Sequence, residues 1–424
     1  MANSLLTSKK ITKAAARLFM NQLGFGMNIN WDWTSEFGQK QAQIGDTVQI
    51  RKPVQPKVIQ GATYTPQAIS EGQVTLAVAR HYQVPLEFSQ YDMTLSIEEF
   101  ADRFIKTATT VLAAQMDADL YAMAISGNPS TSLLGNTVSN CAANQVVGTY
   151  GTALVSNVVG TAMQYLDEHS APADDRYGIL TPAALQQLRK DQISFFNPAG
   201  SISSLYKTGK LGGFYGAEWE SSQSALAGSR TNGAWAGSPV IASASSLTAG
   251  WQPNYTLTVN GFTGGTTVKA GDVFTIANVY DVNPLNKRSL GYLKQWVVLA
   301  DVASAAATGQ QLLVAPFVGD PTNGYANISV APSNGAALTL VGTASTSGQE
   351  SLVFHRDAFA AASPKFDLPK ASSVQEAYNQ RIPSGPNIAF TRTWDAVNFR
   401  WIQRLDVLAA FAMVTPEWAV RIRS

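Results

Sequence analysis

Cysteine, charge and long hydrophobic runs are all scarce in this sequence. Cys141 is the only cysteine among 424 residues, so disulfides within the chain and zinc sites built on thiolates are excluded. Charged residues make up 14% of the chain and nearly balance to a net charge of +1, which predicts no general attraction to nucleic acid, membranes or acidic substrates. The longest apolar run, residues 407–414, is far too short to cross a bilayer, and the N-terminus lacks the apolar core of a signal peptide.

Complete catalytic and metal-binding motifs are missing as well. Residues 355–357 (His-Arg-Asp) have the letters of the kinase catalytic loop, but Ala362 stands where that loop needs a metal-binding Asn. The three histidines are far apart in the sequence, and none belongs to an H-E-x-x-H pattern. Residues 204–209 match S-x-x-K and K-T-G, but both motifs use the same lysine and cannot converge from separate elements. The sequence therefore predicts no enzyme, no cofactor and no metal.

What the sequence does contain is one long helical pattern, residues 96–124. Ser96 and Glu99 have the spacing of a capping box, and Gly127 followed by Pro129 marks the end. At ~1.5 Å per residue this helix would be roughly 45 Å long, which suggests a spine against which another long element lies. Its apolar positions keep to one face and are Ile97, Phe100, Phe104, Ala108, Val111, Leu112, Met116, Leu120 and Met123.

Two segments before this spine have patterns of their own. Residues 8–23 predict an amphipathic helix whose basic side is either solvated or contacts a neighbouring subunit or a polyanion. Residues 39–88 have no helical period; a strand over 47–51, a stretch rich in Pro, and alternating residues over 74–88 predict a long two-stranded ribbon. Such a ribbon is marginally stable alone. Because only the spine would be near it within one chain, a neighbouring subunit is a candidate surface for it.

The middle of the chain combines helices with a block of short strands. Helical spacing over 152–169 and 183–190 flanks a short strand at 177–180, and Thr181-Pro182 is a good helix start. Beyond Gly250 no helix is indicated, and Gly-containing turns separate six short strands, the rhythm of a small inserted β-barrel. These strands are expected at 255–259, 273–277, 295–299, 311–315, 327–330 and 337–341.

The last part of the chain returns to strands of a different kind. Residues 352–359 predict a strand that runs into an apolar segment, and residues 418–422 predict a strand at the very end. Between them, a strand pair over 397–413 is expected to place Val397 on its apolar face, with Gln403 as the one polar break. These strands should build a sheet on the spine helix. The class is therefore α+β, with discontinuous domains around an all-β insert.

This order of segments resembles the major capsid proteins of tailed bacteriophages. It is similar to the coat proteins of short-tailed phages that carry an inserted domain in the Hong Kong phage capsid fold. The likeness extends over essentially the whole chain and is carried by three stretches: 271–284 (GDVFTIANVYDVNP) in the insert, 354–359 (FHRDAF) at its exit, and 404–408 (RLDVL) leading to 416–422 in the closing strands.

The resemblance implies a structural virion protein that assembles with itself into an icosahedral shell around double-stranded DNA. It implies hexamers and pentamers, a scaffolding protein and a portal protein as partners, non-specific contact with packaged DNA, and expansion during maturation. It implies no active site, cofactor or membrane contact. The expected location is the virion, after assembly in the host cytoplasm.

The resemblance also divides the chain and points to an interface. The implied parts are an N-terminal arm (1–38), an extended ribbon over the neighbouring subunit (39–88), a peripheral domain with the spine (89–135 and 365–424), an axial domain (136–248 and 346–364) and an inserted β-barrel (249–345). The candidate assembly residues are Lys10, Lys13, Arg17, Lys57, Tyr64, Glu71, Tyr82, Arg400 and Arg404. The alternative is a phage tail or adhesin-like β-rich structural protein, which suits the small-residue strands but not the long capped spine.

Overall fold

The computed structural model of the chain contains three β-sheets and three α-helices within the residues that it describes. The described residues are 12–13, 15–19, 23–35, 37, 47–53, 55–58, 61, 66, 71–89, 106–128, 138–193, 212–243, 246–368, 375–382, 385–398 and 400–424. The helices are α3 (Lys106–Ser126), α4 (Ser156–Glu168) and α5 (Pro182–Ile193). Short 3-10 helices are η1 (Gly26–Asn28), η2 (Asp32–Ser35), η4 (Gln223–Gly228), η5 (Arg356–Ala358) and η6 (Pro416–Trp418).

The first sheet joins the early part of the chain to its end. Its order is β1-β2-β18-β17-β16, with β15 also paired to β18. The strands are β1 (Thr47–Lys52), β2 (Gly72–Ser89), β15 (Phe359–Ala362), β16 (Gln375–Arg381), β17 (Asn387–Asp395) and β18 (Arg400–Met413). The early part of β2 pairs with β1 and the later part with β18, so the ribbon of β1 and β2 is continuous with the sheet.

A register shift in β2 explains why its alternation serves two cores. The pairing with β18 slips by one residue between Ala409 and Ala410. Because a one-residue slip turns side chains to the opposite face, Val78 joins the core on one face while Tyr82 joins the core on the other. The even-numbered apolar residues of β2 are therefore buried on both sides of the sheet.

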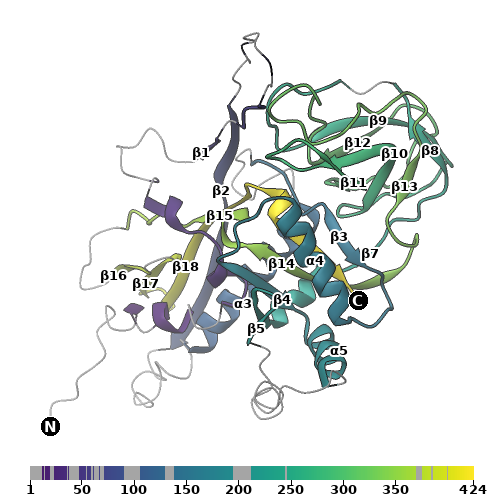
Figure 1. Ribbon diagram of the computed structural model, residues 1–424. Helices are drawn as coiled ribbons and strands as arrows, with labels where there is room; N and C mark the ends of the chain where they lie inside the picture. The colour runs from purple at the N-terminus through teal and green to yellow at the C-terminus, as the bar shows by residue number, and fades with distance from the viewer. Residues whose placement is uncertain are drawn as a thin grey trace.

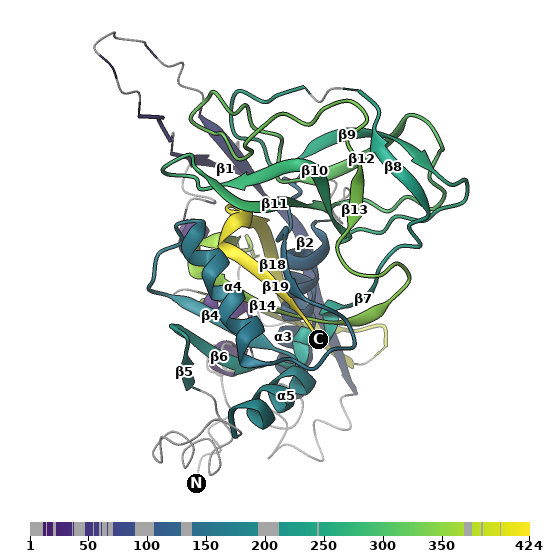
Figure 2. The same ribbon diagram turned by 45° about the vertical axis from the view of Figure 1, so that its right-hand side comes forward.

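The second sheet contains the C-terminal strand in its interior. Its order is β3-β19-β14-β4-β6-β5, with β7 paired to β14. The strand β19 runs antiparallel to β14 and parallel to β3, which confirms that the C-terminus returns to build a sheet. Figure 2 shows α4 and α5 covering this sheet, and Leu166 and Leu188 of these helices share a core with Val420. The strands are β3 (Gln145–Gly148), β4 (Arg176–Leu180), β5 (Gly212–Phe214), β6 (Ala217–Ser221), β7 (Ser229–Thr231), β14 (Ser347–His355) and β19 (Ala419–Arg423).

The third sheet forms the predicted barrel, seen as a separate rounded body at the upper right of Figure 1. Its order is β13-β10-β11-β12-β9-β8. The edges meet where Ile241 N–H donates to the Ala336 carbonyl and Gly335 N–H donates to the Ile241 carbonyl, both at 2.9 Å, so the sheet is nearly closed. The strands are β8 (Gly237–Ile241), β9 (Tyr255–Phe262), β10 (Val273–Val282), β11 (Ser289–Val298), β12 (Gln310–Ala315) and β13 (Leu338–Leu340).

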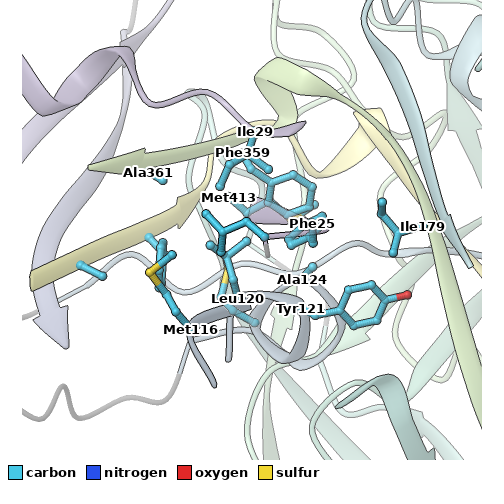
Figure 3. Packing of buried hydrophobic residues seen from close by; sticks show 14 of the residues in the cluster. Phe25, Ile29, Met116, Leu120, Tyr121, Ala124, Ile179, Phe359, Ala361 and Met413 are labelled. Carbon is cyan, nitrogen blue, oxygen red and sulfur yellow. The ribbon is translucent and has the colours of Figure 1, made fainter. Parts of the chain in front are cut away.

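The spine helix packs on the first sheet as expected. Met116 and Leu120 of α3 lie in one core with residues of β18, and Figure 3 shows them beside Phe359 and Met413. Phe25 fills the same core, with ring centroids 5.5 Å from Tyr121 and 5.2 Å from Phe359. The helix is confirmed over residues 106–124 and ends at Ser126, before Gly127; residues 96–105 lie outside the described part of the chain.

Three details of the sequence interpretation are wrong. Val111 was expected on the apolar face of the spine but is 57% exposed. Val397 was expected on the apolar face of a strand pair over 397–413, but it is 92% exposed in the turn before β18, which is one continuous strand. Residues 327–330 form no strand and make a single bridge, from Ile328 to Asp281. For Val397 and residues 327–330 the reason is that hydrophobicity alone does not distinguish a buried strand from an exposed turn, and for Val111 it is that single apolar side chains are common on protein surfaces.

The base of the ribbon packs on its own chain's barrel, which corrects the expectation that only the spine lies near it. Ile50 and Leu76 of the ribbon share a core with Trp251 and Phe317 of the insert. The ammonium of Lys52 lies 4.5 Å from the centroid of the Trp251 ring. The lower part of the ribbon therefore needs no neighbouring subunit for its burial.

Candidate assembly interface

The upper flanks of the ribbon present polar and apolar groups at the surface. Arg51 and Glu71 face each other across it with 3.8 Å between charged atoms, and both side chains are exposed. Lys57 is half-buried and Val58 is 85% exposed, while Tyr64 lies outside the described residues. An exposed ion pair of this kind contributes little to stability, so the side chains of Arg51 and Glu71 can exchange it for contacts with another molecule.

The N-terminal segment is anchored to the spine by one buried carboxylate. Asp117 accepts hydrogen bonds from the backbone N–H groups of Gly24, Phe25 and Gly26 at 3.3, 3.1 and 2.6 Å. Burial raises the pKa of Asp117, and these N–H donors counteract that effect only in part. Sequence analysis placed Asp117 on the spine but gave it no role, because its partners are distant in sequence.

The helical residues before this anchor confirm the amphipathic pattern where they are described. Ala15 and Phe19 are buried, whereas Lys13 and Arg17 are exposed. Lys10 lies outside the described residues. The basic side of this segment therefore faces away from the subunit core at Lys13 and Arg17.

Tyr82, one of the candidate assembly residues, lies inside the subunit. It is only 9% exposed, and its hydroxyl donates to Asp119 Oδ2 at 2.9 Å. The same carboxylate oxygen pairs with Arg80 at 2.8 Å. Tyr82 thus joins the ribbon strand to the spine, and little of its surface is exposed.

Arg400 and Arg404 are already paired within the sheet that carries them. Arg400 contacts Glu87 at 2.5 Å and Asp395 at 3.0 Å, and Arg404 contacts Asp406 at 2.7 Å. Both guanidinium groups remain partly exposed at the surface of β18. They can therefore contribute to a contact only by sharing or exchanging these partners.

A buried ionic joint holds the C-terminal strand, the spine and the barrel together. Glu350 on β14 lies 3.1 Å from Arg421 and 2.9 Å from Arg423, and all three side chains are buried. Arg421 also donates to the carbonyls of Ile125 at the end of α3 and of Gly271 in the barrel, at 2.9 and 3.0 Å. We call these groups the Glu350 joint.

Charge explains the protonation state of the Glu350 joint. Burial alone would raise the pKa of Glu350, but the nearby charges of Arg421, Arg423 and Arg230 lower it to about 2. The carboxyl group is therefore ionised at neutral pH. Sequence analysis missed this joint, because alternating Arg residues in a terminal strand are normally typical of a solvated face.

Two features of the described residues bear on metal binding and on membranes. Within the described ranges, no cluster of three or more His, Cys, Asp or Glu side chains could hold a metal ion. Among the helices in that part of the chain, none is long and apolar enough to cross a membrane.

A sequence model described as P22 coat protein, gene protein 5, matches residues 17–422. The chain belongs to the P22 coat protein family. The match runs from the N-terminal segment to the last strand, so it includes the spine, the barrel and the Glu350 joint. The coat protein is thus a structural protein of a phage capsid shell and part of the virion. The alternative of a tail or adhesin-like protein is set aside by this match.

Solved structures show distant likeness to this coat protein. A chain of Mycobacterium phage Che8 is 12% identical, with 94% of this chain and 90% of that chain covered and a TM-score of 0.46. The capsid of Cyanophage P-SCSP1u is 12% identical, with 91% and 85% covered and a TM-score of 0.43. A virus-like particle from Pyrococcus furiosus is 6% identical, with 98% of each chain covered and a TM-score of 0.39. No curated protein matches, and the assignment rests on the family match.

Proposed function

We propose that this coat protein assembles into the icosahedral shell of a short-tailed phage and encloses its double-stranded DNA. Its partners are further copies of itself in hexamers and pentamers, a scaffolding protein and a portal protein. Assembly takes place in the host cytoplasm, and the shell expands when DNA enters. The observation that carries this proposal is the family match over residues 17–422.

The ribbon supplies the contact between subunits in this proposal. Its base is held by the subunit itself, since Ile50 and Leu76 are buried against the barrel. Its upper flank leaves Val58 exposed. Contact with a neighbour is therefore assigned to residues 57–71 at the tip, with Lys57 and Glu71 at its two ends. A directional contact that repeats from subunit to subunit closes rings.

The roles of the remaining parts in this proposal are those that the family resemblance implies. The spine and the first sheet form the peripheral domain, the second sheet with α4 and α5 forms the axial domain, and the barrel faces outward or sideways. Lys13 and Arg17 contact a neighbouring subunit or the packaged DNA. A net charge of +1 lets the shell enclose DNA without binding it tightly, because tight binding needs many cationic contacts to phosphates.

Deletion of residues 57–71 tests the role of the ribbon. The deletion leaves residues 53–56 to connect Lys52 with Gly72, which are already paired, and a loop of this size is common in hairpins. We expect a folded, soluble subunit that forms no shells under conditions where the full chain does, as judged by electron microscopy. The control is Arg51→Gln, which removes the same exposed ion pair from outside residues 57–71 and should assemble normally. Normal shells from the deletion would contradict the role of the ribbon.

A further inference from the structure

A buried polar cluster lies where the barrel meets the rest of the subunit. Asp281 on β10 and Lys294 on β11 belong to the barrel, whereas His169 follows α4 and Gln145 begins β3. None of these four side chains is more than 1% exposed. Burying charged groups is costly unless they are paired, so the cluster calls for an explanation beyond packing.

Asp281 is the centre of the cluster and uses both carboxylate oxygens. Its Oδ2 accepts from Gln145 Nε2 at 2.9 Å and lies 3.1 Å from His169 Nε2. Its Oδ1 accepts from Lys294 Nζ at 2.9 Å and from the N–H of Val282 at 2.9 Å. Two of these partners belong to the barrel and two to the body, so the carboxylate ties the two parts together.

The hydrogen bonds of His169 define its protonation state. Its Nδ1 lies 2.8 Å from the carbonyl oxygen of Tyr165, while its Nε2 faces Asp281. Both partners accept hydrogen bonds and neither can donate one, so both contacts are satisfied only when both ring nitrogens carry protons. Burial lowers the pKa of His169, but the hydrogen bond and charge of Asp281 outweigh burial and raise the pKa above its usual value.

We propose that His169 and Asp281 form a protonation-dependent latch that fixes the barrel to the body of the subunit. When the imidazole is doubly protonated, it donates to Asp281 across the junction and the barrel is held. When the ring loses a proton, one of its two contacts loses its hydrogen bond and the attachment of the barrel weakens, while the hydrogen bonds from Gln145 to Asp281 and from Asn283 to the Glu168 carbonyl remain. The latch is a property of the single subunit and does not depend on the assembly proposed above.

Other charged and titratable groups face the latch, and none replaces His169. Lys294 opposes the charge of His169 and supports the ionised form of Asp281. Glu168 and Tyr165 stand on α4, and Tyr292 stands on β11. A cavity of about 290 Å³ borders the latch on its other side, and its lining includes His169, Lys294, Arg51, Lys52, Asp357 and Glu417.

A second joint keeps the barrel attached when the latch opens. The Glu350 joint links Arg421 to the Gly271 carbonyl and Arg423 to the Val341 carbonyl, both in the insert. The Glu350 carboxyl is ionised far below neutral pH, with a pKa of about 2, so this joint does not change near neutrality. The barrel therefore stays attached at this joint when the latch weakens.

The sign of the pH dependence follows from the raised pKa of the ring. Below the ordinary pKa of a free histidine, about 6.5, the ring is protonated in both the closed and the open arrangement and the latch is fully effective. Above it, opening releases a proton, so the ratio of open to closed subunits rises about tenfold for each pH unit. The rise stops above the pKa that His169 has in the closed latch.

The test measures the distance between barrel and body in the unassembled subunit. Spin labels at Gln164→Cys on α4 and Asn286→Cys on the barrel, in a Cys141→Ala background, are compared between pH 6 and pH 9. We expect one narrow distance at pH 6 and a growing second population at higher pH. In His169→Gln the size of the second population should not change with pH, because glutamine cannot titrate. His81→Gln is the matched control, since His81 also pairs with a carboxylate, Asp406 at 2.8 Å, but away from the barrel.

A second measurement keeps the proposal falsifiable if the variants fail to fold. Nitrogen chemical shifts of the His169 ring in the wild-type subunit should show a doubly protonated ring at pH 7. A neutral ring at pH 7 would overturn the latch. So would a distance that stays the same from pH 6 to pH 9, or a pH profile of His169→Gln identical to that of the wild type.

Discussion

Removal of the charge on Glu350 is the sharpest test of how the subunit is held together. The substitution Glu350→Gln keeps the shape of the side chain but leaves Arg421, Arg423 and Arg230 without their shared carboxylate. All of these groups are buried or nearly so, and water cannot replace the lost partner. The stability lost in this variant therefore measures how much the Glu350 joint contributes to holding the C-terminal strand, the spine and the barrel together.

The loss of unfolding free energy in Glu350→Gln can be judged from the pKa of Glu350 and from the usual cost of breaking a buried ion pair. A pKa lowered from its ordinary value of 4.5 to about 2 corresponds to a preference of about 3 kcal/mol for the ionised carboxyl in the folded subunit. Removing one partner of a buried ion pair costs about 3–5 kcal/mol. We therefore expect Glu350→Gln to lower the free energy of unfolding by about 3 kcal/mol.

Urea unfolding of the unassembled subunit at several pH values is the assay. The folded-state pKa of Glu350 is depressed, so its contribution is complete above about pH 4.5 and is lost as the pH falls through about 2. Wild type should lose this stability over that range, and Glu350→Gln should not. The control Glu71→Gln breaks the exposed pair with Arg51 and should cost less than about 1 kcal/mol. Equal costs for the two variants would refute the reasoning.

Two further predictions concern packing and the barrel. Gly178→Ala would place a methyl group 2.2 Å from the Trp219 ring and should lower the unfolding free energy by about 1–3 kcal/mol. The control Gly213→Ala meets nothing within 4 Å and should lower it by less than about 0.5 kcal/mol. Equal losses for the two variants would contradict this packing. A fragment of residues 237–345 should fold alone, with the circular dichroism spectrum of a β domain. A shorter fragment of residues 249–345 should be less stable, because it lacks β8, which closes the barrel. A disordered spectrum for the longer fragment would show that the barrel does not fold independently.

Much of the fold could be predicted because local patterns agree with the final packing. The helices α4 and α5 form where the apolar spacing indicated them, and Thr181 Oγ1 accepts from the Ala184 N–H as the predicted cap. Five of the six strands expected after Gly250 are present. Their turns contain Gly, which marks strand ends clearly in a sequence.

The buried ionic groups could not be predicted, because burial is a tertiary property. Arg421 and Arg423 alternate with apolar residues, which is typical of a strand with one solvated face. In the structure both faces of β19 are covered, and the arginines find Glu350 from a strand distant in sequence. The contact of His169 with Asp281 is hidden in the same way, since the two residues are 112 positions apart in the sequence.

The ribbon shows where sequence reasoning was partly right. Its strands β1 and β2 were indicated by their alternation, but the barrel surface that covers Ile50 and Leu76 was not. The strands β16 and β17 were missed because residues 375–395 have no regular alternation of apolar and polar residues. Their pairing depends on β18, which lies beside β17 in the folded sheet.

Cryo-electron microscopy of particles formed by the full chain with its scaffolding protein would show directly whether residues 57–71 of each ribbon contact the next subunit. Closed shells are expected in which the base of each ribbon lies on its own barrel and residues 57–71 lie on the next subunit. Assembly through the ribbon tip would be contradicted if the protein stayed as single subunits at high concentration. It would also be contradicted by shells in which residues 57–71 fold back onto their own subunit.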